Sequence, residues 1–322
     1  MEASKPLAAA PPNEFDARQL IQALLGEPAL TLTRFSTGMC HYVYDVVMQN
    51  GKRVVARIAN PDRSAAIAGA IYWSQKLRPL GVPVADIIAA DPQGQITGHA
   101  AMILERLPGT DLAHVYAKMD SPAKESLAEE MVRFRHAMDR LPLGGGYGFA
   151  YDYEHSWQHS AWADVVRASI DRSRQRIMDV GLVRPYFADL VTSAFTLFES
   201  ELRLMPPRPF MDDATTKNVI IHENRLSGIV DVDELCFGDP LFNVALTHTS
   251  LLAMQADTHY TEHWLKLLGA EAADWPLFRF YVAVFLLDFL SESGLHFNRG
   301  TPQFMDDQYR LRLEELLIGM VS

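Results

Sequence analysis

The stretch from Phe210 to Asp239 limits the possible folds of this chain more than any other part of its sequence. Two short apolar runs, Val219–Ile221 and Leu226–Val230, lie within it and are separated by four polar residues. Short apolar runs joined by a polar turn predict a β-hairpin. Because a hairpin folds back on itself, the residues just before and just after it should lie side by side.

Three oxygen-bearing side chains flank the predicted hairpin. Asn218 precedes its first strand, Asp231 follows its second, and Asp213 lies five residues before Asn218 on the incoming loop. Amide and carboxylate oxygens are ligands for a hard cation such as Mg²⁺, and a further carboxylate can orient a hydroxyl and accept its proton. Any one of these residues alone is typical of a solvated turn, but the set at this spacing indicates phosphoryl transfer.

The same residues carry a family resemblance. The pattern Asp213-x4-Asn218, a hairpin, Asp231 and then Gly238-Asp239-Pro240 resembles the aminoglycoside phosphotransferase and choline kinase-like family. The resemblance implies a protein-kinase-like fold and ATP-dependent transfer to a small molecule. It further implies that Asp213 is the catalytic base and that Asn218 and Asp231 hold Mg²⁺.

The chain departs from the family pattern at two neighbouring positions. Met211 stands where the family commonly has a histidine that supports the loop, and Asp212 replaces a common glycine. Neither change removes a group that does chemistry. By the same resemblance, Asp239 braces the loop.

The sequence from residue 30 to residue 58 predicts three β-strands. Runs at 30–35, 42–48 and 54–58 are β-prone, and Asn50-Gly51 is a strong hairpin-turn signal between the last two. A small-residue turn lies between the first two runs. By the resemblance, its amides would cover the phosphates of ATP; taken alone, it is an ordinary hairpin turn. Its residues are Ser36, Thr37 and Gly38.

Arg57 occupies the position on the third predicted strand where a kinase-like fold has its phosphate-binding lysine. Arginine keeps the positive charge but presents a rigid fork instead of a point charge. The following helix, predicted from Arg63 to Leu77, has no acidic residue between Ser64 and Gln75. The usual Lys–Glu pair is therefore absent, or its acid comes from elsewhere.

The resemblance also places the adenine-binding hinge and divides the chain. Backbone groups of Glu105, Arg106 and Leu107 are expected to meet the adenine edge. We predict an α+β, protein-kinase-like fold with a small β-rich N-lobe and a larger, mainly helical C-lobe. The expected divisions are a disordered arm over 1–14, the N-lobe over 15–107 and the C-lobe over 108–322.

Hydrophobic periodicity predicts helices over 16–25, with Asp16 as cap, and throughout the C-lobe. The C-lobe helices are expected at 123–141, 157–181, 187–204, 241–254, 259–268, 275–291 and 305–320. In the family, the late helices help to form the acceptor site. Acidic residues that could line it and hold ammonium groups are Asp233, Glu234, Asp288 and Glu292, although solvated helix charges are the plainer interpretation of the last two.

The composition of the chain limits the classes of molecule that it is expected to bind. The 322 residues carry a net charge of −11, which argues against nucleic acid and favours, weakly, a cationic small-molecule substrate. No apolar run is long enough to span a membrane. Two cysteines, with no signal-peptide pattern, suggest a reducing cytoplasm. The oligomeric state stays open.

Two other functions remain open at this point. A catalytically weak nucleotide-binding or regulatory module on the same fold would explain Arg57, the acid-free helix and Met211. Retention of all three oxygen-bearing residues argues against it. A protein kinase is disfavoured, because the short segment from Asp231 to Gly238 leaves no room for an activation loop.

Overall fold

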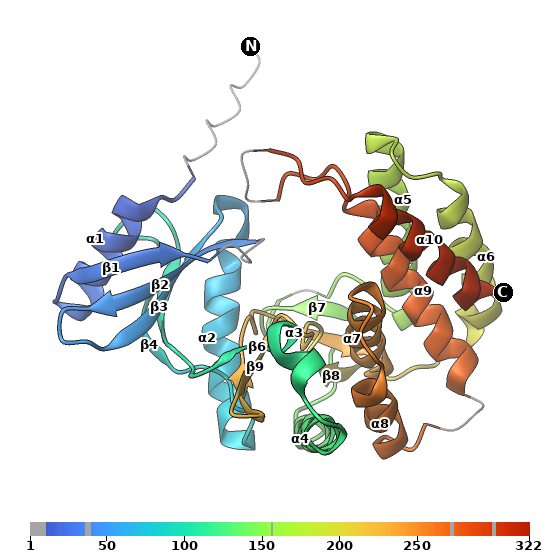
Figure 1. Cartoon of the computed structure of the whole chain (residues 1–322), viewed down its shortest axis with the longest axis horizontal. Helices are drawn as coiled ribbons and strands as arrows, with labels where there is room; N and C mark the ends of the chain where they lie inside the picture. The colour runs from blue at the N-terminus through green and yellow to red at the C-terminus, as the bar shows by residue number, and fades with distance from the viewer. Residues whose placement is uncertain (1–10, 36–39, 156, 271–273, 298–300) are drawn as a thin grey trace, which may run out of the picture.

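The computed structural model describes residues 11–35, 40–155, 157–270, 274–297 and 301–322. The chain forms two lobes: a sheet with two helices at the N-terminal end and a larger, mostly helical lobe after it (Figure 1). The predicted α+β, two-lobed fold is confirmed. The predicted Ser36–Gly38 turn lies outside the described residues.

One five-stranded antiparallel sheet, in the order β1-β2-β3-β5-β4, forms the N-terminal lobe. The turn between β2 and β3 places Gly51 at a φ of 82°, as the Asn-Gly signal predicted. The strands are β1 (Ala29–Arg34), β2 (His41–Met48), β3 (Arg53–Ala59), β4 (Ile87–Asp91) and β5 (Ala101–Glu105).

The two faces of this sheet are covered by different helices. Alternation along β5 sends Ala101 and Ile103 toward α1 (Glu14–Leu25), whereas Met102 packs with α2 (Ala65–Leu77). On β3 the residues at 54, 56 and 58 pack with α1. Arg57 therefore points to the opposite face, the one that carries α2.

The start of α1 differs from the prediction. Asn13, not Asp16, caps the helix: its side chain accepts from the amides of Phe15 and Asp16. Asp16 closes a capping box by accepting from the Asn13 amide. The predicted end at Leu25 is confirmed, and Gly26 follows it in the left-handed conformation.

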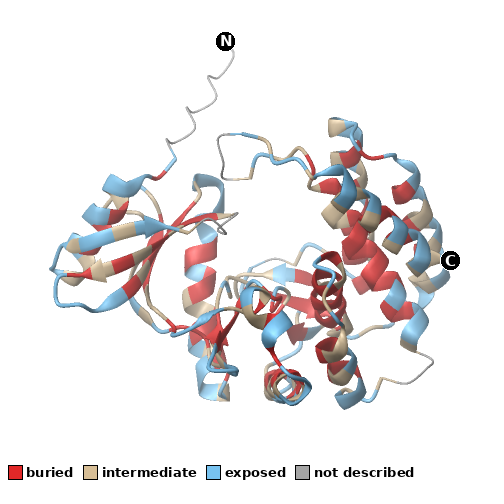
Figure 2. Cartoon of the chain, in the orientation of Figure 1, coloured by how far each residue is buried: buried red, intermediate tan, exposed pale blue. Residues whose placement is uncertain are grey.

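The helical lobe is built around α9 (Trp275–Ser291). This helix is apolar on nearly all sides and contacts α5, α6, α7 and α10. Figure 2 shows its buried residues in red along most of its length. The other helices are α3 (Leu112–Val115), α4 (Ser121–Met138), α5 (Trp162–Val180), α6 (Tyr186–Leu202), α7 (Leu241–Ala253), α8 (His259–Leu267) and α10 (Asp307–Val321). None of the described helices has the length and apolarity needed to cross a bilayer.

The predicted helix over 157–181 is wrong at its start, because α5 begins only at Trp162. The residues before it form local turns instead: the carboxylate of Asp152 accepts from the amides of Glu154 and His155. Tyr147 and His159 form an isolated β-bridge. Side-chain bonds of this kind compete with helix formation.

The stretch from Phe210 to Asp239, from which the fold was predicted, contributes strands to two three-stranded sheets. The hairpin β9 (Val219–His222) and β10 (Arg225–Ile229) is confirmed, and β6 (Thr110–Asp111) extends it. Its two turn residues, Glu223 and Asn224, have φ values of 49° and 60°, as a tight hairpin turn requires. The second sheet has the order β7-β11-β8, with β7 at Gly148–Ala150, β8 at Arg208–Phe210 and β11 at Leu235–Gly238.

A buried hydrogen-bond chain ties the end of β11 to the helical core. The Tyr281 hydroxyl donates to Asp239 Oδ2 at 2.9 Å and accepts from Trp162 Nε1 at 2.9 Å. Asp239 Oδ1 accepts from the Leu241 amide at 3.0 Å. Gly238 lies so close to Trp162 that a Cβ there would overlap the indole ring. Asp239 thus joins the β11 loop, α5, α7 and α9.

Replacing Tyr281 with Phe should therefore destabilise the protein by about 2–4 kcal/mol, because it leaves both Asp239 Oδ2 and Trp162 Nε1 buried without that partner. Urea unfolding measures the loss. Tyr186→Phe, at a tyrosine that is 51% exposed, is the matched control and should change the free energy of unfolding by less than about 0.5 kcal/mol. Equal unfolding midpoints for the Tyr281 variant and the wild type would contradict the role of this chain.

Candidate active site

The hairpin brings Asn218 and Asp231 together at its open end. Val230 donates its amide to the Asn218 carbonyl at 2.9 Å, directly beyond the last strand pair. The side-chain nitrogen of Asn218 donates to the Asp213 carbonyl at 2.9 Å, so its Oδ1 is the end that could meet a cation. Asp231 has a φ of 64°. A left-handed aspartate is uncommon, and such conformations concentrate at functional sites.

Asp213 lies on the loop between β8 and β9 and is exposed to solvent. Its Oδ1 accepts from the Thr215 hydroxyl at 2.8 Å, which fixes the carboxylate. Protein packed around this carboxyl, and the negative charge of Asp231 nearby, raise the pKa of Asp213 to about 6. A carboxylate held in place with a pKa close to neutrality is suited to accept a proton.

Side chains of helix α7 form hydrogen bonds with this loop. Asn243 donates its side-chain nitrogen to the Met211 carbonyl, and Thr247 donates to the Ala214 carbonyl at 3.3 Å. Ser250 shares a hydrogen bond of 2.9 Å with Thr216. Side-chain bonds from α7 to the loop's main chain thus hold the segment in which Met211 replaces the family's histidine.

The signal for these bonds was present in the sequence and was missed. Asn243, Thr247 and Ser250 stand at i, i+4 and i+7 on a helix that is otherwise largely apolar. That spacing puts three polar side chains on one buried face. A buried polar stripe of this kind predicts hydrogen bonds to a neighbouring segment.

Across the lobe boundary, Arg57 meets two carboxylates. Its guanidinium nitrogen Nη2 lies 2.5 Å from both Asp231 Oδ1 and Asp233 Oδ2, and the residue is only 4% exposed. Burial disfavours the charged guanidinium, but Asp233 and Asp231 outweigh it and raise the pKa of Arg57. Arg57 therefore stays a cation.

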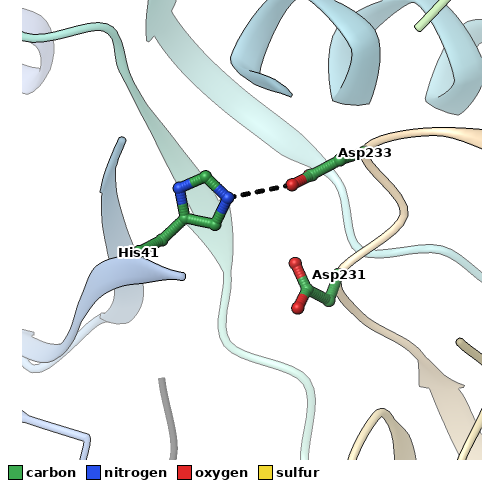
Figure 3. A group of neighbouring side chains, drawn as sticks. All are labelled: His41, Asp231 and Asp233. Carbon is green, nitrogen blue, oxygen red and sulfur yellow. Dashed lines mark hydrogen bonds and ion pairs between the residues drawn. The ribbon is translucent and has the colours of Figure 1, made fainter. Parts of the chain in front are cut away.

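His41, at the start of β2, completes this group. Its Nε2 lies 3.0 Å from Asp233 Oδ2, as Figure 3 shows. Burial favours the neutral form of Asp233, but Arg57 and His41 outweigh it and lower the pKa of Asp233. The sequence interpretation missed His41.

His41, Asp231 and Asp233 are the described residues of metal-binding type whose donor atoms come together, within 4.8 Å of one another. Arg57 already supplies a positive charge to both carboxylates there. The oxygens that suit Mg²⁺ are those of Asp231 and Asn218, with phosphates and water completing the shell. The donor set thus fits the ion that the fold implies.

The remaining expected nucleotide contacts lie at the end of β5. The Glu105 amide donates to the Asp86 carbonyl at 2.8 Å, so this N–H is already committed within the protein. Arg106 donates to the Leu107 carbonyl at 2.8 Å and pairs with Asp45 at 3.6 Å. The adenine contact of this segment stays a prediction.

The four acidic residues expected at the acceptor site divide into separate groups. Asp233 pairs with Arg57 and His41, as described above. Glu234 lies beside it, and burial and the Asp233 charge raise the pKa of Glu234 to about 7. Burial and the nearby Glu234 also raise the pKa of Asp212 well above its usual range. The charges of Asp212 and Glu234 therefore interact, and Asp212 directly precedes Asp213 in the loop.

Asp288 and Glu292 belong to α9 and its end. Asp288 accepts from Arg172 and Arg176, at 3.3 Å each, and from Ser173 at 3.2 Å, so its charge is already balanced. Burial and the charge of Asp288 raise the pKa of Glu292 to about 7. The charge of Lys217, on the loop between β8 and β9, acts in the opposite direction. Glu292 is therefore the member of this second group that lies near the loop.

Solved structures with the same fold include aminoglycoside phosphotransferases. The apo form of a thermostable mutant of aminoglycoside phosphotransferase APH(4)-Ia matches with a TM-score of 0.70 and 16% identity, over 95% of this chain and 98% of that one. A ternary complex of such a mutant with ADP and hygromycin B matches with a TM-score of 0.67 and 16% identity, over 95% and 97%. The GDP complex of aminoglycoside 2'-phosphotransferase-IIIa matches with 0.66 and 15%, over 94% and 96%.

No curated protein matches the sequence significantly. The model of the phosphotransferase enzyme family, by contrast, matches residues 31–281, well over half of the chain and every described element from β2 to β11. Fold and sequence agree on the suspected family. The chain belongs to the phosphotransferase enzyme family.

Proposed function

We propose that this protein transfers the γ-phosphoryl group of ATP to a hydroxyl of a small molecule. The observation that carries the proposal is the meeting of Asp213, Asn218 and Asp231 at the open end of one hairpin, with buried Arg57 facing them from the other lobe. Phosphoryl transfer needs little covalent chemistry from the protein; it needs positioning and charge stabilisation. These residues offer both.

Each residue has a separate task. Asp213 orients the acceptor hydroxyl and accepts its proton, while Thr215 holds the carboxylate in place. Arg57 binds the nucleotide phosphates. Asn218 and Asp231 would hold Mg²⁺, which supplies charge neutralisation at the phosphates when bound.

We further propose that the acceptor is a small hydroxyl compound and that positive charge on it is favoured. Asp212 directly precedes Asp213, and its charge interacts with that of Glu234, so an ammonium group bound at this end of the loop would meet acidic side chains. The net charge of −11 would add long-range attraction. Asp288 contributes less, because Arg172 and Arg176 already neutralise it.

The alternative is a nucleotide-binding module with weak catalysis. It is favoured by one observation: Arg57 contacts Asp231, so a metal ion would have to share or replace that contact. Asp231 is 45% exposed on its side chain, which leaves it open to a second partner. We therefore rank catalysis first.

Asp213→Asn should lower phosphoryl transfer by at least about 100-fold, because it removes the proton acceptor. Binding of ATP with Mg²⁺ should remain. Transfer is measured with labelled ATP against a panel of hydroxyl compounds, and binding by calorimetry. The control is Asp189→Asn, which breaks an ion pair between Asp189 on α6 and Arg174 on α5 and should leave turnover unchanged. Turnover that survives in the Asp213 variant would overturn its assignment as base.

ATP and Mg²⁺ together should raise the melting temperature of the wild type more than either alone. At 100 times the dissociation constant, binding stabilises the native state by about 2.7 kcal/mol. In Asn218→Ala, which loses one of the two metal ligands, the extra shift from Mg²⁺ should shrink or vanish. If the nucleotide alone gave the full rise in melting temperature, in both the wild type and Asn218→Ala, the regulatory module would be favoured.

The value of kcat/KM should fall about tenfold per pH unit below pH 6, because only the ionised carboxylate of Asp213 accepts a proton and its pKa is about 6. Above that pH the profile should level off. Glu234, whose pKa is about 7, is the competing source of such a slope. The slope should persist in Glu234→Gln; its disappearance there would assign it to Glu234.

A further inference from the structure

The carboxylates that balance the buried guanidinium of Arg57 come from a different part of the chain than in a protein kinase. In a protein kinase the strand lysine pairs with a glutamate on the next helix. Here that helix is α2, whose sequence AAIAGAIYWSQKL contains no acid. The partners of Arg57 come instead from the segment between β10 and β11, in the other lobe.

The packing of α2 explains why no acid reaches Arg57 from the helix. A Cβ placed on Gly69 would overlap the main-chain carbonyl oxygen of Asp233 and approach the ring of Tyr151. The helix main chain therefore lies directly against the segment that carries Asp233. At Gly69 this segment occupies the space of a side chain, and it presents its own carboxylate to Arg57.

The two carboxylates on Arg57 differ in their surroundings. The side chain of Asp233 is 13% exposed and receives a second contact from His41 at 3.0 Å. The side chain of Asp231 is 45% exposed and stands beside Asn218 at the open end of the hairpin. The first carboxylate is fixed between two buried partners, whereas the second is open to exchange.

We propose that Asp233, steadied by His41, is the positioning residue that orients Arg57 toward the nucleotide phosphates, and that Asp231 shares Arg57 only while no metal ion is bound. The proposal rests on the proposed function, because it concerns the same nucleotide site. Asp233 would then take the place of the helix glutamate of the Lys–Glu pair, which α2 lacks.

The two carboxylates should then have opposite effects on ATP binding without metal. Loss of Asp233 leaves Arg57 and His41 without their shared partner, so the guanidinium is no longer aimed at the phosphates. Loss of Asp231 removes a competitor for Arg57 and a negative charge that repels phosphate. A purely structural role for both residues would weaken binding in both variants.

The test is calorimetric binding of ATP to the full-length protein with a chelator present, so that no metal contributes. Asp233→Asn should bind about tenfold more weakly than the wild type, the loss expected for a charge-assisted hydrogen bond. Asp231→Asn should bind as tightly as the wild type or tighter. Asp233→Glu, which keeps the charge, should recover part of the loss. Asp189→Asn, which breaks the ion pair between Asp189 on α6 and Arg174 on α5, is the matched control and should bind ATP as the wild type does.

The outcomes separate this proposal from the proposed function. A wild type that binds ATP and an Asp233→Asn variant that binds it equally well would overturn the positioning role alone. A wild type that binds no ATP, with or without Mg²⁺, would overturn both. If Asp233→Asn does not fold, His41→Gln leaves the Arg57–Asp233 pair in place and should weaken metal-free binding about threefold; unchanged binding there would also overturn the proposal.

Discussion

A buried positive charge shared between the lobes is the interaction on which the site depends. Arg57 belongs to a strand of the N-terminal sheet, and both of its carboxylate partners follow the hairpin of the helical lobe. A guanidinium that is 4% exposed would be very costly without counter-charges. The burial of Arg57 and the approach of the two lobes therefore require each other. His41 adds a further contact from the sheet to the same segment.

The candidate site combines an exposed carboxylate with a main chain that is held in place by hydrogen bonds. Asp213 is exposed, yet the carbonyls of its loop are held by Asn243 and Thr247 from α7. The far end of the segment is fixed by Asp239, which accepts a hydrogen bond from the buried Tyr281 of the largely apolar helix α9. A site supported in this way keeps its geometry without a ligand, as positioning catalysis requires.

The sequence was sufficient for the fold and for the local geometry, and insufficient for contacts between lobes. The hairpin and its turn follow from a local pattern, which is why Asn218 and Asp231 could be placed side by side. Asp233 was expected at the acceptor, but it contacts a residue 176 positions away, and no periodicity reports such a distance. The roles assigned to Asp213, Asn218 and Asp231 stay predictions.

The absence of an acidic residue from α2 has a consequence for the ways in which Arg57 could be switched. Protein kinases are switched when the helix after the lysine strand swings and carries its glutamate away, which breaks the ion pair. In this chain the helix carries no acid, so its movement removes no counter-charge from Arg57. That off-state does not exist here. In a chain built this way, a swing of α2 alone would leave Arg57 paired with Asp231 and Asp233.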